Sequence, residues 1–163
     1  MFRVIGALMI IFAGSMIGIL KADGLKKRVE CLERIIAGLS LLETEITYGK
    51  SDLFSTLFSI GESHKTDVFK KIAQNLSKDG IKVATKKALA EEDFLLERDK
   101  APIMALAENL GMTDSITQAS AIKRAVSVLS EGRKNAREEY AKLGKLYRSC
   151  GVLGGILGAI ILI

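Results

Sequence analysis

Two uncharged, apolar segments flank a charged middle, and this division limits the possible folds more than any other feature. All 19 acidic residues and 23 of the 24 basic residues lie between Lys21 and Arg148. Arg3 carries the one charged side chain outside that span. Apolar surfaces of this size are rarely left in contact with water, so both ends of the chain require an apolar environment.

Both ends suggest transmembrane helices. A helix needs about 20 apolar residues, with a range near 17–25, to cross the hydrocarbon core of a bilayer. Residues 4–20 give 17 uncharged residues, whereas residues 149–163 give 15, which is short. Snorkelling of Lys145 and Arg148, or local thinning of the bilayer, would extend the second span. A cleaved signal peptide is the alternative for the first segment, but no small-residue cleavage site follows it.

Basic residues border each apolar segment on the side that faces the middle of the chain. The first segment is preceded by Arg3 and followed by Lys21, Lys26, Lys27, Arg28 and Arg34. Six basic residues precede the second segment, and none follows it: Arg133, Lys134, Arg137, Lys142, Lys145 and Arg148. Because cytoplasmic loops are enriched in Lys and Arg, we predict an integral membrane protein with residues 21–148 in the cytoplasm and both termini outside.

Glycines recur four residues apart in both apolar segments. The pairs are Gly14 with Gly18, Gly151 with Gly155, and Gly154 with Gly158. Residues four apart share a helix face, and a missing side chain lets another backbone approach closely. We therefore predict that these six glycines are transmembrane packing residues, although glycine is also frequent in membrane helices in general. The pattern does not indicate whether the two segments pack on each other or on other proteins.

The middle of the chain is predicted to be helical. It is rich in Ala, Leu, Lys and Glu, and only Ile81–Thr85 hints at a strand. Apolar residues recur at intervals of three and four, which is typical of amphipathic helices. The helices are expected over residues 24–47, 52–60, 66–76, 81–92, 100–110 and from a cap at Asp114 or Ser115 onward. The first and last of these lead into the apolar segments without a break.

These patterns together predict an all-α protein: a helical-bundle cytoplasmic domain flanked by N- and C-terminal transmembrane helices. The expected parts are an N-terminal transmembrane helix over residues 1–21, a cytoplasmic domain over residues 22–148 and a C-terminal transmembrane helix over residues 149–163. Two cysteines, Cys31 and Cys150, do not form a disulfide framework and are expected to be free thiols.

No catalytic, metal or cofactor site is recognisable. Gly49-Lys50-Ser51 matches the end of a phosphate-binding loop, but Glu45 stands where that motif requires glycine. His64 has no ligand cluster around it. The acidic stretch between Glu91 and Asp99 is interpreted as a solvated face or a dock for a basic partner. Since the middle carries 23 basic against 19 acidic residues, it does not suggest nucleic-acid binding. We expect no enzymatic activity, no cofactor and no small-molecule substrate.

The chain resembles the stage III sporulation protein AB family of endospore-forming bacteria. The shared pattern is an apolar span beginning with Gly6-Ala7, then basic residues and a Leu-rich helix ending in "LETEITYG", residues 42–49. A second element, "LGMTDSITQ" over residues 110–118, also resembles that family. The length and the glycine-containing apolar C-terminus match as well, so the resemblance covers essentially the whole chain.

The resemblance implies a non-enzymatic platform protein in a secretion-like complex of the mother cell, in the membrane that faces the forespore. The family's cytoplasmic part is similar to the inner-membrane platform of type II secretion systems, which works beside a cytoplasmic ATPase. The implied partners are the other proteins of the stage III sporulation operon, including its ATPase. Leu42 belongs to the family signature, and its remaining members form the expected partner interface: Glu43, Glu45, Tyr48 and Gly49. A small membrane transporter or channel subunit is the alternative, although neither span contains the ionisable groups that this function predicts.

Overall fold

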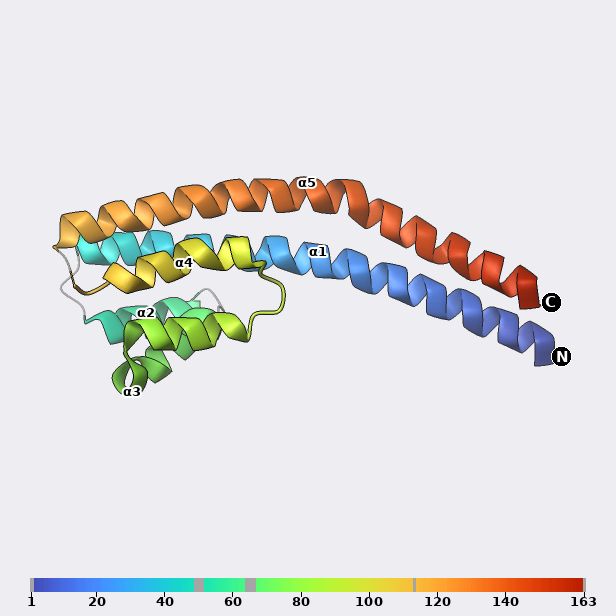
Figure 1. The fold of residues 1–163 in the computed structure, drawn as a ribbon, viewed down its shortest axis with the longest axis horizontal. Helices are drawn as coiled ribbons and strands as arrows, with labels where there is room; N and C mark the ends of the chain where they lie inside the picture. Colours follow the sequence, from blue (N-terminus) through green and yellow to red (C-terminus); the bar gives the residue numbers. More distant parts are fainter. Residues whose placement is uncertain (1, 49–51, 64–66, 113, 163) are drawn as a thin grey trace. The chain divides into compact units, whose positions relative to one another are not determined.

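The computed structural model describes residues 2–48, 52–63, 67–112 and 114–162. These residues form five α-helices: α1 (Phe2–Tyr48), α2 (Leu53–Ser63), α3 (Asp67–Ala90), α4 (Glu97–Asn109) and α5 (Ser115–Leu162), which Figure 1 labels. No strand occurs among the described residues, and the segment Ile81–Thr85 is helical. The prediction of an all-α protein is therefore confirmed.

The chain divides into two compact units. Unit 1 contains residues 1–29 and 135–163, and unit 2 contains residues 30–134. Both α1 and α5 continue through this division, so the predicted continuity of the outer helices with the apolar segments is confirmed. The division follows contacts between residues and not polarity. The predicted membrane limits, at residues 21 and 149, therefore stay predictions.

Apolar side chains from all five helices form the core of unit 2. The face of α1 that was predicted to be apolar is buried at Leu32, Ile35, Leu39 and Leu42. Side chains from the other four helices complete this core, among them Leu57, Ile60, Phe69, Ile72, Leu89, Ile103, Leu106, Ile122 and Leu129. Gly38 also lies on the buried face of α1, where an added Cβ would overlap with the Phe69 ring. The short helices are thus held against one face of α1.

Gly80 bends α3 into two helical segments. Its φ of 71° and ψ of 165° lie in a region that residues with a Cβ rarely adopt. The sequence predicts separate helices on either side of Ser77–Gly80, and the structure confirms a break there. The break is a kink at one residue and not a loop.

The predicted start of α4 is wrong by three residues. The sequence places Pro102 in the first turn, but α4 begins at Glu97 and Pro102 lies in its second turn. Asp99 belongs to the acidic stretch that was interpreted as exposed, yet it is only 3% exposed. Its carboxylate accepts a hydrogen bond from the Leu96 backbone N–H at 3.1 Å. Asp99 therefore satisfies one of the donors that a helix start leaves without a partner.

Cys31 of α1 lies next to the same acidic stretch, close to Glu92. Its Sγ lies 3.7 Å from Glu92 Oε2. Burial, followed by the negative charge of Glu92, raises the pKa of the Cys31 thiol to about 12. Since the thiolate is the reactive form, Cys31 is an inert structural residue near neutral pH.

We expect Gly80→Ala to lower the free energy of unfolding by about 1–3 kcal/mol, because alanine opposes the backbone conformation at the kink. Crowding would not contribute, since an added Cβ meets nothing within 4 Å. Gly24→Ala is the matched control: its Cβ is equally unobstructed, but Gly24 lies within a regular helix. That change should stabilise by about 0.5–1 kcal/mol. Urea unfolding in mild detergent, followed by circular dichroism, measures both, and equal effects would contradict a conformational role for Gly80.

Candidate functional site

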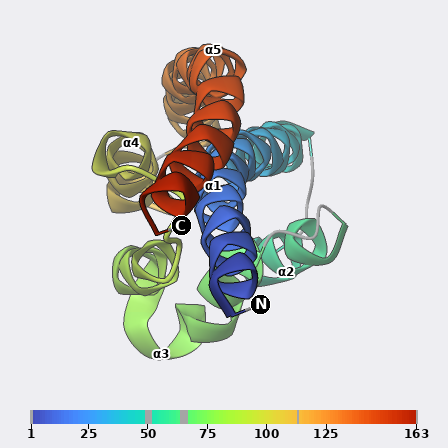
Figure 2. The ribbon, with the colours of Figure 1, turned by 90° about the vertical axis from the view of Figure 1, so that its right-hand side faces the viewer.

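In unit 1, α1 and α5 run antiparallel and touch through glycines, with both ends of the chain on one side (Figures 1 and 2). A Cβ added to Gly14 would lie 2.8 Å from the Gly151 carbonyl oxygen. A Cβ added to Gly151 would lie 2.7 Å from the Gly14 carbonyl oxygen, and one on Gly18 would overlap with the Tyr147 carbonyl. Only glycine permits backbones this close, because any Cβ would push them apart.

Five of the six glycines selected from the sequence face the other helix of this unit. Besides Gly14, Gly18 and Gly151, a Cβ on Gly155 would lie 2.8 Å from Ile11 Cα. A Cβ on Gly158 would lie 3.0 Å from an Ile10 methyl carbon, whereas one on Gly154 meets nothing within 4 Å. The sequence left the glycines' partner open, and for these five the partner is the other end of the same chain.

The two helices of unit 1 change from apolar to charged at the same level. On α1 the change occurs at Lys21, and on α5 it occurs at Arg148. The Lys21 ammonium nitrogen lies 5.7 Å from the centre of the Tyr147 ring, which aligns the two changes. Arg148 Nη2 donates to the Tyr140 hydroxyl at 3.3 Å. We call this level the polarity border; tyrosines and cations of this kind are typical of membrane–water interfaces.

Side chains on opposite sides of the polarity border differ sharply. On the terminal side, large apolar residues are exposed on both helices, including Leu8, Phe12, Met16, Leu153, Leu157 and Ile160. On the other side, Arg28 is buried and its Nη1 lies 3.0 Å from Glu139 Oε2. A buried cation requires a partner of this kind.

A second candidate site lies in unit 2, where the two segments that carry the family resemblance meet. A pocket of about 240 Å³ is lined by Leu42, Glu45 and Ile46 from the first segment and by Gly111, Ser115 and Gln118 from the second. Leu53 and Thr56 of α2 complete the lining. Residues about 70 positions apart thus form one surface, which we call the signature pocket.

The turn before α5 shapes one side of the signature pocket. Asp114 accepts hydrogen bonds from the Thr117 hydroxyl at 2.7 Å and the Thr117 backbone N–H at 3.0 Å. These bonds, led by that from the hydroxyl, lower the pKa of Asp114 below its ordinary value. Of the two caps that the sequence left open, Asp114 is therefore the one observed. Gln118 instead accepts from the Gly111 N–H at 3.3 Å, across a turn in which Gly111 has a φ of 82°.

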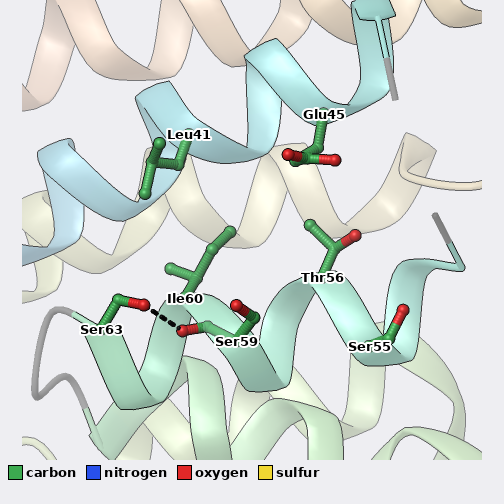
Figure 3. A pocket seen from close by; sticks show the side chains of 7 residues that line it. All are labelled: Leu41, Glu45, Ser55, Thr56, Ser59, Ile60 and Ser63. Carbon is green, nitrogen blue, oxygen red and sulfur yellow. Dashed lines mark hydrogen bonds between the residues drawn. The ribbon is translucent and has the colours of Figure 1, made fainter. Parts of the chain in front are cut away.

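Glu45 also lines a larger groove of about 420 Å³ between α1 and α2. Figure 3 shows its carboxylate and Leu41 on α1, facing Thr56, Ile60 and the serines of α2. Two of these serine hydroxyls donate to backbone carbonyls: Ser63 to Ser59 at 2.8 Å, and Ser55 to Asp52 at 2.8 Å. The groove therefore presents one carboxylate beside a mixed apolar and hydroxyl surface.

The predicted interface residues differ in their surroundings. Glu43 Oε1 lies 3.4 Å from Lys123 Nζ on α5, and its side chain is 25% exposed. Glu45 faces the two hollows beside α2, and Tyr48 is 85% exposed. Gly49 lies outside the described residues, as does His64. Sequence reasoning did not single out Met112 and Ile116 as interface residues, and these apolar side chains are 82% and 78% exposed.

The described lining of the two hollows is mostly hydroxyl and aliphatic, with one carboxylate. No group of three or more His, Cys, Asp or Glu residues is placed to hold a metal ion within the part of the chain that the structure describes. Around Glu45 the described lining contributes hydroxyls, aliphatic groups and one amide, and none of these is a histidine or cysteine nucleophile or base.

Comparisons with known proteins identify the family of the chain. Residues 3–163 match the family described as Stage III sporulation protein AB. The stage III sporulation protein AB of Bacillus subtilis (strain 168) is 29% identical over 165 residues, which cover 96% of each chain. No solved structure matches. Because the family match extends over nearly the whole sequence, the chain belongs to the stage III sporulation protein AB family.

Proposed function

We propose that this sporulation protein is a non-enzymatic membrane platform of a secretion-like stage III complex, and that it couples a cytoplasmic ATPase to membrane components. Its partners would be other proteins of the stage III operon. The observation that carries the proposal is the combination of a glycine-packed apolar helix pair with an exposed carboxylate surface at the family's signature segments. The first supports a membrane anchor, and the second supports a partner contact.

Unit 1 supports two membrane spans. Among the described helices, α1 is the one that is long and apolar enough to cross a membrane by length and composition alone. The apolar end of α5 is shorter, but glycine contacts hold it along α1 and the two polarity changes coincide. A helix packed in this way shares the environment of its neighbour, and its outward side chains are apolar as well. Residues 21–148 then face the cytoplasm of the mother cell, in the membrane next to the forespore.

The same contacts argue against a transporter or channel subunit. Substrate or ion paths through a membrane are lined by ionisable or polar groups, and residues 4–20 and 149–163 contain no Asp, Glu, His, Lys or Arg. The backbones of α1 and α5 also meet directly at Gly14 and Gly151, which leaves no room for a path between them.

Glu45 and Tyr48 are the residues that we assign to the partner contact. Both are exposed, and no residue among those described forms an ion pair with Glu45. Glu43 has a different role in this proposal, since its contact with Lys123 joins α1 to α5 within unit 2. An exposed pair of this kind contributes at most about 1 kcal/mol.

The helix contact is tested by Gly18→Leu, with Gly154→Leu as the matched control. At Gly18 the new side chain must displace the backbone at Tyr147, whereas at Gly154 it meets open space. We expect Gly18→Leu to cost about 1–3 kcal/mol or more, and Gly154→Leu to have little effect. Thermal unfolding in mild detergent measures both. If the two variants melted alike, the observed packing of α1 on α5 would be wrong.

Topology is tested with single cysteines in a Cys31→Ser, Cys150→Ser background. A membrane-impermeant maleimide added to intact, non-sporulating cells that express the protein in their plasma membrane should label a cysteine next to either terminus, because both ends are proposed to lie outside. A cysteine at Lys86, which is exposed on α3, should be labelled only after the cells are opened. Labelling at Lys86 but at neither terminus would reverse the proposed orientation, and labelling at one terminus alone would remove the second span.

The partner contact is tested by purifying the protein from sporulating cells in mild detergent and measuring how much of the operon's ATPase accompanies it. We expect Glu45→Lys to reduce recovery at least about tenfold, because reversing a charge at an interface places like charges together. Tyr48→Ala should also reduce recovery, since exposed tyrosines often anchor interfaces. Glu131→Lys, the same charge change at an exposed position of α5, is the control and should leave recovery unchanged. Failure to recover the ATPase with the unaltered protein in any mild detergent would contradict the proposal.

A further inference from the structure

The net positive charge of the protein is confined to unit 1. This unit contains nine basic and three acidic residues, a net charge of +6, whereas unit 2 contains fifteen basic and sixteen acidic residues, a net charge of −1. The two values account for the +5 of the whole chain. The excess positive charge therefore lies on unit 1, which also contains the two apolar ends, whereas the charges of unit 2 nearly balance.

Most of this charge lies directly beyond the polarity border. Six exposed basic residues follow it within about two helical turns, and we call them the basic collar: Lys21, Lys26 and Lys27 on α1, with Lys142, Lys145 and Arg148 on α5. The acidic residues of the unit offset this charge only in part. Glu139 is engaged by the buried Arg28, which leaves Asp23 within the collar segment of α1 and Glu138 further along α5.

The collar residues point in different directions around their helices. At 3.6 residues per turn, Lys21, Lys26 and Lys27 lie at about 0°, 140° and 240° around α1. Lys142, Lys145 and Arg148 spread over about 120° around α5. Cations arranged around two helices at one level cannot converge on a single small anion. They match a layer of anions that surrounds the helix pair.

We propose that the basic collar binds the headgroups of anionic phospholipids such as phosphatidylglycerol. The inference rests on the membrane insertion of unit 1 that is proposed above, because insertion to the polarity border brings the collar to the level of the lipid phosphates. A zwitterionic headgroup neutralises its own phosphate, whereas an anionic headgroup leaves a charge for Lys or Arg. Each basic residue near an anionic bilayer surface contributes roughly a fivefold gain in affinity.

The test uses the full chain, purified in mild detergent and titrated with phosphatidylglycerol or phosphatidylcholine, with bound lipids counted by native mass spectrometry. The unaltered protein should bind phosphatidylglycerol at least about tenfold more tightly than phosphatidylcholine. The collar variant Lys26→Gln, Lys27→Gln, Lys142→Gln, Lys145→Gln should lose this preference. The control variant Lys78→Gln, Lys86→Gln, Arg98→Gln, Arg124→Gln removes the same charge from exposed positions of unit 2 and should retain it.

Three outcomes would overturn the inference. These are equal binding of the two lipids, an equal loss in both quadruple variants, and displacement of the lipid by millimolar glycerol phosphate, which would indicate a site for a soluble anion. Arginine at the same four collar positions should preserve the preference, and this separates lost charge from misfolding. If the protein needs detergent but shows no lipid preference, only this inference fails. A protein that stays soluble without detergent would instead contradict the proposed function.

Discussion

The direct approach of two helix backbones in unit 1 is the constraint on which the rest of the structure depends. If this helix pair lies in hydrocarbon, as proposed, burying apolar side chains against each other gains nothing, and close packing of small residues must hold the helices together. Gly14, Gly18, Gly151 and Gly155 provide that packing. Because each glycine seats against backbone atoms, the contact also sets the register of α5 along α1. A slip of one helical turn would move α5 by about 5.4 Å and separate Lys21 from Tyr147.

The register of α5 along α1 aligns the points at which the two helices change from apolar to charged. The apolar segments of α1 and α5 end more than 120 positions apart in the sequence. The two ends lie at one level, the polarity border, because the helices are packed in this register. Beyond this border the contact changes in kind, from glycine against backbone to the buried pair of Arg28 and Glu139. The pair lies where water is available to the exposed part of Glu139, and a charged contact is tolerable there because its desolvation is incomplete.

Much of the fold could be predicted from the sequence because it depends on local patterns. The apolar stripe of α1, the break at Gly80 and the continuity of both outer helices all follow from spacing and backbone freedom. The start of α4 could not be predicted, because Asp99 looks like its acidic neighbours until its burial is known. Glycine spacing predicted packing faces without their partner, since each helix offers the same pattern to any close neighbour. The interface prediction shows the same limit: Glu43 and Glu45 differ only in what α5 and α2 place beside them.

The signature pocket extends this point from single residues to function. Leu42 and Glu45 are separated from Gly111 and Gln118 by a whole set of short helices, and no sequence pattern shows that they share a lining. The structure shows which polar groups of this lining already have partners. The hydroxyls of Ser55 and Ser63 donate to backbone oxygens, Asp114 is occupied by Thr117, and Glu43 is next to Lys123. Among the described residues of these two hollows, Glu45 is left as the charged group that faces outward without an ion-pair partner. For a partner of the kind proposed above, Lys or Arg would match this carboxylate best, because charge-assisted hydrogen bonds are the stronger ones.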